Sequence, residues 1–257
     1  MALKKGTSVD IRDKSVAVIA LAALALHPLV GRAPSFVHWI AASLSVGVAL
    51  VAQRSSPPVR SLAAMLASLA IAMQLPVPWQ LTMLLAMVGF LALGRVVPPL
   101  RPSDTWRARG RVPLAWTLLV GGVTPIALVG WMVLFHPNLR DVVGAYVPDL
   151  PMPVLIAGAV GFALVNAALE ELIWRGALQD RLAPVFGARG AVALQALSFG
   201  VQHLWGVPRG IVGVLLAGVW AVMLGLLRRK AGGLLAPFLA HVVADATIAV
   251  IVLGYVR

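Results

Sequence analysis

The feature that most constrains this chain is a series of apolar runs, each about 15 to 25 residues long, that recur along its whole length. A helix of about 20 apolar residues crosses the roughly 30 Å hydrocarbon core of a bilayer, because each residue rises 1.5 Å. Hydrophobic residues make up 60% of the 257 positions, and the mean hydropathy is +0.93. The sequence therefore predicts an all-α, polytopic membrane protein with about 8–9 transmembrane helices.

Nine candidate spans can be placed on the sequence. They cover residues 16–30, 36–52, 61–75, 79–94, 113–135, 153–177, 192–205, 211–227 and 234–254. If the short third and fourth spans were a single span, the count would be eight. The helices of the N-terminal half would then cross the membrane in the opposite direction.

The positive charge follows this arrangement. Lys and Arg number 21, the formal net charge is +12, and cytoplasmic loops of membrane proteins are enriched in these residues. A cytoplasmic N-terminus and an outside C-terminus leave only four basic residues on the outer side, so the other 17 are inside: the four are Arg32, Arg140, Arg209 and Arg257. We expect an integral multi-pass protein of a bacterial inner (plasma) membrane, with the lipid bilayer as partner and no nucleic acid.

Polar residues inside the apolar spans gather between positions 166 and 245. A charged side chain at mid-bilayer costs roughly 2.5–3.5 kcal/mol, so several in one region indicate a shared purpose. Glu171 and Arg175 are four residues apart in the favourable order for an ion pair, which predicts a structural role for Glu171. Glu170 points about 100° away, and Asn166, one turn before it, can hydrogen-bond it, so Glu170 is the candidate general base.

A second cluster holds Phe199 and His203, one turn apart on one helical stripe. A turn signal around Gly187 separates it from the first cluster and predicts an antiparallel helical hairpin. Glu170 lies 17 residues before Gly187 and His203 lies 16 residues after it. Equal spacing from the turn predicts that the two side chains lie at equal depth.

The third cluster is His241 with Asp245, again one turn apart. At 1.5 Å per residue, His241 lies about 10 Å from the boundary near Leu234, which the charge pattern makes cytoplasmic. All three clusters can then meet on the cytoplasmic side of the bilayer centre. We therefore expect Glu170, His203 and His241 to converge to within about one bridging water.

The first 112 residues hold few side chains suited to chemistry. His27 and His38, and His136 further along the chain, fall at predicted membrane–water interfaces, where a solvated histidine is expected. Trp79, Trp106, Trp116 and Trp131 lie near span ends and suit an aromatic belt. The chain has no cysteine, which excludes disulfides, thiolate zinc sites and a cysteine nucleophile.

The order Glu170-Glu171-x-x-x-Arg175, then Phe199-x-x-x-His203, then His241-x-x-x-Asp245 resembles the CAAX prenyl protease and bacteriocin-processing enzyme family of intramembrane proteases. The resemblance covers roughly residues 153–254. It implies a catalytic core at 151–257, while residues 1–150 are N-terminal transmembrane helices of unassigned role. Where some members of the family have Asn, this chain has Asp245, and an ionised aspartate cannot donate a hydrogen bond to an oxyanion.

The resemblance implies hydrolysis of a peptide bond within a membrane cavity open to the cytoplasm. The substrate would be a membrane-embedded or lipid-anchored protein, cleaved at a prenylated tail or a C-terminal membrane anchor. Glu170, helped by His203, would deprotonate a water. His241 would stabilise the oxyanion, with Asp245 orienting its ring.

Three alternatives use the same residues. A zinc ion held by Glu170, His203 and His241 would give a metalloprotease, although the HExxH spacing is missing. Catalysis by glutamate without a cofactor is favoured, because Asn166 and Asp245 also suit a role in proton transfer. The polar residues could instead join helices in a non-catalytic scaffold. A proton-coupled transporter would usually show matching features in both halves, and the N-terminal half offers none.

Overall fold

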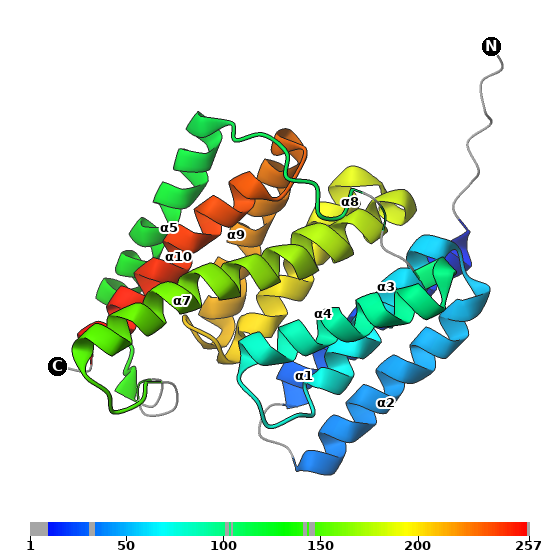
Figure 1. Ribbon diagram of the computed structural model, residues 1–257, viewed down its shortest axis with the longest axis horizontal. Coiled ribbons are helices and arrows are strands. Elements are labelled where there is room, and N and C mark those ends of the chain that lie inside the picture. Colours follow the sequence, from blue (N-terminus) through cyan, green and yellow to red (C-terminus); the bar gives the residue numbers. More distant parts are fainter. Residues whose placement is uncertain are drawn as a thin grey trace.

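A computed structural model of the chain describes residues 10–30, 34–100, 103, 105–140, 143 and 147–255. The elements formed by these residues are all helices (Figure 1), which confirms the predicted all-α class. Five of the basic residues in the charge argument lie outside the described ranges: Lys4, Lys5, Arg32, Arg101 and Arg257.

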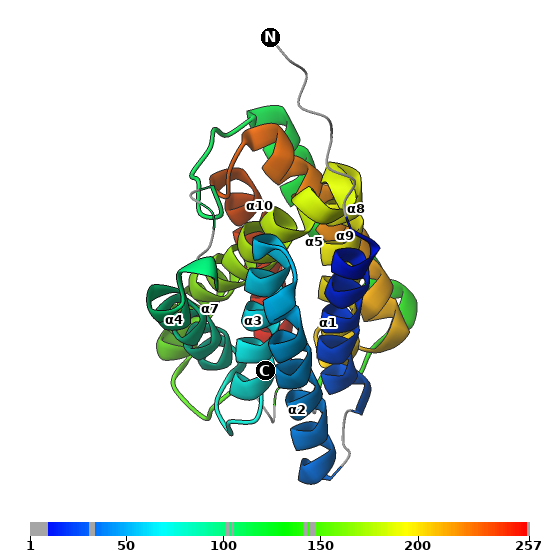
Figure 2. The ribbon, with the colours of Figure 1, turned by 90° about the vertical axis from the view of Figure 1, so that its right-hand side faces the viewer.

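The N-terminal helices pack around α3. This region contains α1 (Ile11–Val30), α2 (Ser35–Val51), α3 (Pro57–Ala72) and α4 (Trp79–Val96), with the short 3₁₀ turns η1 (Ala52–Arg54) and η2 (Pro98–Leu100). Eleven of the 16 residues of α3 are buried, so α3 presents apolar side chains to neighbours on almost every side. Figure 2 shows α3 between α1, α2 and α4.

The C-terminal region contains the longest helices. They are α5 (Leu114–Phe135), α7 (Met152–Glu170), the π-helix η3 (Glu171–Leu178), α8 (Gln179–Gln202), the 3₁₀ turn η4 (His203–Trp205), α9 (Gly210–Ala231) and α10 (Leu235–Gly254). Gly232 ends α9 in the left-handed conformation, with a φ of 71°, which glycine adopts without a steric penalty.

Seven helices in the described part of the chain are long and apolar enough to cross a membrane. The difference from nine predicted spans has two causes. One run, Met152–Trp205, is continuous over 54 residues although its backbone is not helical at Gly187, where φ is 72° and ψ is 170°. The 16-residue α3 is shorter than the others and is counted separately.

The chain turns back at Gly187, as the sequence predicts. Gln179 and Gln195 lie eight residues before and after Gly187, and the side chains of both reach Gly225 of α9. Arg175 and Phe199 lie twelve residues before and after it, and the guanidinium carbon is 4.4 Å from the ring centroid. The two arms therefore run side by side with residues at equal spacing facing each other.

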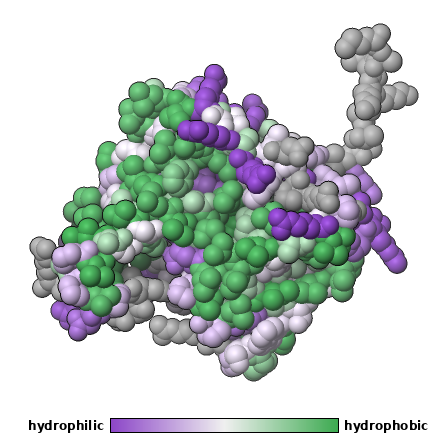
Figure 3. Space-filling model, viewed as in Figure 1, coloured by the Kyte–Doolittle hydropathy of each residue, from purple (hydrophilic) through white to green (hydrophobic). Residues whose placement is uncertain are grey.

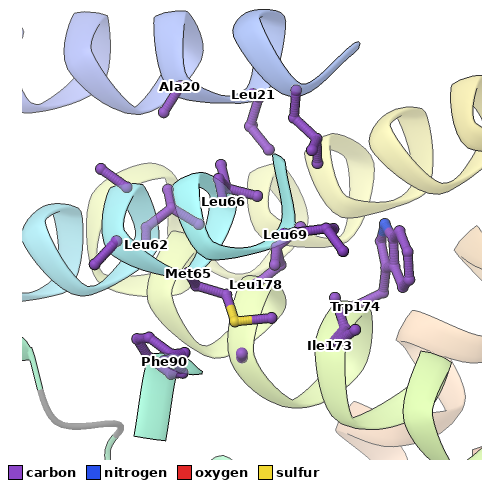
Figure 4. Close-up of a cluster of buried hydrophobic side chains, with 14 of the residues drawn as sticks. Ala20, Leu21, Leu62, Met65, Leu66, Leu69, Phe90, Ile173, Trp174 and Leu178 are labelled. Carbon is purple, nitrogen blue, oxygen red and sulfur yellow. The ribbon is translucent and has the colours of Figure 1, made fainter. Parts of the chain in front are cut away.

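The hairpin packs against α3. In Figure 4, Leu178 of η3 lies beside Leu69 of α3, Ile173 and Trp174 of η3 lie at the edge of the same cluster, and Ala20 and Leu21 of α1 lie on the other side of α3. All of these side chains belong to one buried cluster. The N-terminal helices thus hold the first arm of the hairpin by close apolar packing.

Hydrogen bonds tie the helix ends into two opposite rims. We call one the basic rim: Ser56 N donates to Asp13 Oδ1, Leu234 N donates to Ala108 O, and Thr105 Oγ1 donates to Asp180 Oδ1. At the other end, the opposite rim, Trp205 Nε1 donates to Pro28 O and Tyr255 Oη donates to Pro137 O. The two rims are separated by the length of the helices.

Positive charge is concentrated on the basic rim. Fifteen described Lys and Arg residues lie near helix ends, and only Arg140 and Arg209 of these are at the opposite rim. The thirteen at the basic rim are Arg12, Lys14, Arg54, Arg60, Arg95, Arg107, Arg109, Arg111, Arg181, Arg189, Arg228, Arg229 and Lys230. Figure 3 shows a broad apolar surface between the rims, with most hydrophilic side chains along its upper and right-hand edges.

Candidate active site

An ion pair lies at the centre of the polar cluster. Arg175 Nη1 is 2.9 Å from Glu171 Oε1, four residues away on the same helix, and both side chains are almost fully buried. The guanidinium also lies over the Phe199 ring from the second arm of the hairpin. A buried charge is tolerated when it is paired, so the ion pair predicted from the spacing is present and is covered by an aromatic face.

His241 of α10 connects the clusters. Its Nδ1 is 2.7 Å from Glu171 Oε1, and because a carboxylate only accepts, Nδ1–H is the donor. The other ring nitrogen, Nε2, is 3.4 Å from Glu170 Oε2 and 3.7 Å from Asp245 Oδ1. The ring also meets Trp220 edge to face, with a centroid distance of 4.7 Å. Three carboxylates and an aromatic ring therefore fix the imidazole.

The contacts of Glu171 correct one expectation. The sequence reasoning assigned Glu170 and Glu171 to separate faces, with only Glu170 at the reacting centre, but both contact His241, one at each ring nitrogen. The π-helix begins at Glu171. A π-helix has more residues per turn than an α-helix, so adjacent side chains diverge by less than 100°, and such segments are frequent at functional sites.

Asn166 makes different contacts from those expected. We expected its amide to bond Glu170, one turn away, but Asn166 Nδ2 donates to Asp245 Oδ2 at 3.1 Å. Asn166 Oδ1 accepts from Gln80 Nε2, also at 3.1 Å, which fixes the orientation of the amide. Asp245 thus has a donor from α7 on one oxygen and His241 near the other.

The N-terminal region contributes two site residues that the sequence reasoning missed. Gln80 contacts Asn166, and Trp79 Nε1 donates to Glu170 Oε1 at 3.1 Å. Trp79 is therefore not simply part of an aromatic belt. Of the other belt candidates, Trp106 and Trp131 are buried, and Trp116 is 49% exposed. Trp79 and Gln80 follow Pro78 at the start of a predicted span, and nothing in the local sequence indicated that they contact the site.

His203 lies beside the cluster. Its Nδ1 is 2.9 Å from Phe199 O, and its ring packs against the Phe199 ring with a centroid distance of 4.4 Å and a tilt of 40°, as the one-turn spacing predicts. His203 interacts electrostatically with Glu170, and both line the same cavity. The Phe199 ring separates His203 from Arg175 and reaches the His241 ring at 6.1 Å.

A cavity of about 920 Å³ begins at this cluster. Its polar floor includes Glu170, His203 and Asp245, and its walls are mostly apolar. Met73 and Pro78, at the two ends of the turn between α3 and α4, contribute to its lining. α3 rises only about 24 Å from the basic rim over 16 residues, whereas α5 rises about 33 Å over 22.

The histidines expected at solvated interfaces differ in their surroundings. His136 is exposed and ends α5 with a φ of 43°. His38 is half-buried, but His27 is only 3% exposed, so the expectation of a solvated His27 is wrong. His27 lies where α1 lines the cavity, and its Nδ1 is 3.4 Å from Gln74 Nε2.

The described residues contain no group of three or more His, Asp or Glu side chains arranged to hold a metal ion. Glu170 and His241 are close, but His203 directs Nδ1 to a backbone carbonyl and has no direct contact with either among the described interactions. The zinc ligand set considered from the sequence is therefore not assembled in this geometry.

Comparison with known proteins gives one match. Residues 152–247 match the family model described as type II CAAX prenyl endopeptidase Rce1-like. No curated protein and no solved structure matches the chain. The matched segment contains α7, η3, α8 and α9, together with the part of α10 that carries His241 and Asp245. The helices that carry the candidate site therefore match the model of the Rce1-like family of CAAX prenyl endopeptidases, as the resemblance predicted.

Proposed function

We propose that this protein is an intramembrane endopeptidase that hydrolyses a peptide bond in a membrane-associated protein. The observation that carries the proposal is the pairing of Glu170 with His241 at 3.4 Å, where Glu170 lines a cavity with mostly apolar walls. A carboxylate and an imidazole within proton-transfer reach, in a cavity that can admit water, suit general acid–base catalysis. The match to an endopeptidase family over the same helices supports the reaction class.

Glu170 is the proposed general base. Its Oε1 accepts from Trp79 and its Oε2 faces His241, so the carboxylate is held in one orientation. A water between Glu170 and His203 would lose its proton to Glu170 as it attacks the scissile carbonyl. Trp79 acts as a positioning residue, because it contacts the base and not the reacting atoms.

His241 is proposed to stabilise the oxyanion and to carry protons. Glu171 holds Nδ1–H, so Nε2 is the nitrogen available on the side of Glu170 and Asp245. With Nε2 protonated, His241 would donate to the developing oxyanion. Glu171 therefore orients the His241 ring through Nδ1, a role that the sequence analysis assigned to Asp245. Asp245 faces Nε2 and could hold the transferred proton.

Catalysis by zinc remains the alternative that needs a direct test. Metal analysis of the protein purified without chelator would find about one equivalent of zinc if the metal carried the reaction. We expect activity to survive extensive chelation with no metal bound. Loss of activity on chelation, restored by added zinc, would instead identify a metalloprotease.

The orientation that we propose follows the charge. The basic rim faces the cytoplasm, in accord with the positive-inside rule, and the opposite rim faces the exterior. The N-terminus is then cytoplasmic, and a bacterial inner membrane is the expected location. Reporter fusions after Arg109 and Arg229 should report cytoplasm, whereas a fusion after Arg257 should report the exterior.

The Glu170→Gln variant tests the catalytic assignment. Gln keeps the size and can still accept from Trp79, but it cannot take a proton, so hydrolysis should fall by roughly 10²–10⁴-fold at unchanged folded yield. Asp149→Asn, which removes an exposed carboxylate, is the matched control. The readout is the set of new peptide termini in membranes that contain wild type or variant. Identical termini from wild type and Glu170→Gln would contradict the proposal.

A further inference from the structure

The lining of the cavity extends away from the candidate site toward one rim. On α10 its lining runs from Asp245 to Leu253, away from the basic rim, and on the hairpin it includes Gln202 to Val207 at the far end. The remaining mouth residues lie at helix ends and turns of the opposite rim: Pro28, His38, Met73, Pro78, Val147, Pro148, Leu150 and Val252. The residues that line the cavity therefore lead from the candidate site to the opposite rim.

His241, which pairs with Glu170 but does not line the cavity, lies near the basic-rim end of α10, whereas His203 lies at the opposite end of α8. His241 is six residues after Leu235, the first residue of α10, which corresponds to about 9 Å. The spacing of His241 from the start of α10 thus agrees with its predicted depth. The resemblance implies a cavity open to the cytoplasm, whereas the lining residues lead toward the opposite rim.

The charge of the cavity limits what can enter. No Lys or Arg is among its described lining residues, while Glu170 and Asp245 lie on its floor. The buried Arg175 is already paired with Glu171. A prenylated CAAX tail ends in a free carboxylate close to its lipidated cysteine. That carboxylate would approach two acidic side chains without a cation to neutralise it, which is unfavourable in a low-dielectric site.

We propose that the cavity receives its substrate from the exterior, as an apolar and uncharged internal segment next to the outer end of a membrane anchor. Apolar wall residues such as Leu155, Phe162 and Ile248 would contact such a segment, and Trp205 lies at the mouth with 48% of its surface exposed. The inference rests on the proposed endopeptidase function for the substrate, and on the charge pattern for the side of entry.

Single-cysteine labelling tests the side of entry without any need for catalysis, because the chain has no native cysteine. Ala249→Cys lies in the cavity lining, and Val250→Cys, its neighbour, faces outward into the apolar surface. A membrane-impermeant maleimide added to intact cells should label Ala249→Cys and leave Val250→Cys unlabelled. Arg229→Cys, at the basic rim, should react only after permeabilisation.

Labelling of Ala249→Cys only after permeabilisation, together with labelling of Arg229→Cys in intact cells, would overturn the orientation. Absence of labelling of Ala249→Cys from both sides would overturn the open cavity. Both results would leave the proposed hydrolysis untouched, since neither measures it.

The substrate is tested with purified protein and one apolar decapeptide, prepared as a C-terminal amide and as a free acid. We expect the amide to be cleaved at least roughly tenfold faster, because it carries no terminal negative charge into the cavity. Equal rates, or faster cleavage of the free acid, would overturn the substrate class. If neither peptide is cleaved by wild type more than by Glu170→Gln, the hydrolytic function itself fails.

Discussion

The helices before residue 100 and those after residue 150 bury very different side chains. In α1 to α4 the buried polar residues are mostly isolated hydroxyl groups, such as Ser45, Ser61 and Thr82. In η3 and α10 they are charged or ionisable and contact one another across helices. Close apolar packing thus holds the first region, whereas polar contacts join the helices of the second. The first region nevertheless places Trp79 against the second, so the two regions form one site.

Among the variants that test this contrast, Arg175→Met should have the largest effect on stability. The substitution leaves Glu171 buried at 1% exposure without its cation, and breaking a buried pair in this way costs about 3–5 kcal/mol. We expect a much lower folded yield and a lower midpoint of thermal unfolding in detergent. Arg95→Met, at an exposed position of α4, should change neither. Normal stability of Arg175→Met would mean that polar contacts do not hold the second region together.

A smaller effect is expected from Leu69→Ala in α3, where the side chain is fully buried in the core of Figure 4. The loss should be about 2 kcal/mol, at the low end for buried leucine, because lipid is as apolar as the core and only packing is lost. Thermal unfolding measures it, with Leu84→Ala on the exposed face of α4 as control. The folded fraction should keep its rate of hydrolysis. A change in that rate larger than the change in stability would show that α3 shapes the site directly.

The smallest effect should come from Trp79→Phe, which removes the indole N–H and keeps an aromatic ring. A hydrogen bond to a charged group contributes about 1.5 kcal/mol, so hydrolysis should slow roughly tenfold with little change in stability. Trp116→Phe, at an exposed indole that Lys230 covers, should leave the rate unchanged. If both variants behave as wild type, Trp79 contributes packing only. The N-terminal helices would then take no direct part in the site.

The sequence predicts those parts of the site that depend on residues one turn apart or on spacing from a turn. The Glu171–Arg175 pair, the packing of Phe199 against His203 and the hairpin at Gly187 all follow from helix geometry. The contacts between distant segments do not. Trp79 and Glu170 are far apart in the chain, and their hydrogen bond depends on how α4 packs against α7.

Two other features were also beyond the sequence pattern. The π-helix at Glu171–Leu178 changes the angle between the two glutamates, and its sequence carries no glycine or proline signal before Gly176. The direction in which the cavity lining extends depends on how helix ends and turns from distant parts of the chain pack together, which the sequence pattern does not give. The spans themselves were predictable because apolar length alone defines them.

The short spacing of Glu171 and Arg175 also bears on how the chain enters the membrane. Both residues lie on one helical turn, so their charges can neutralise each other as soon as that turn forms, before any later helix has been synthesised. Glu170 has to wait for His241, which follows it by 71 positions in the sequence. During biogenesis the first arm of the hairpin therefore brings one uncompensated carboxylate into the insertion machinery, and the arrival of the last helix completes its neutralisation.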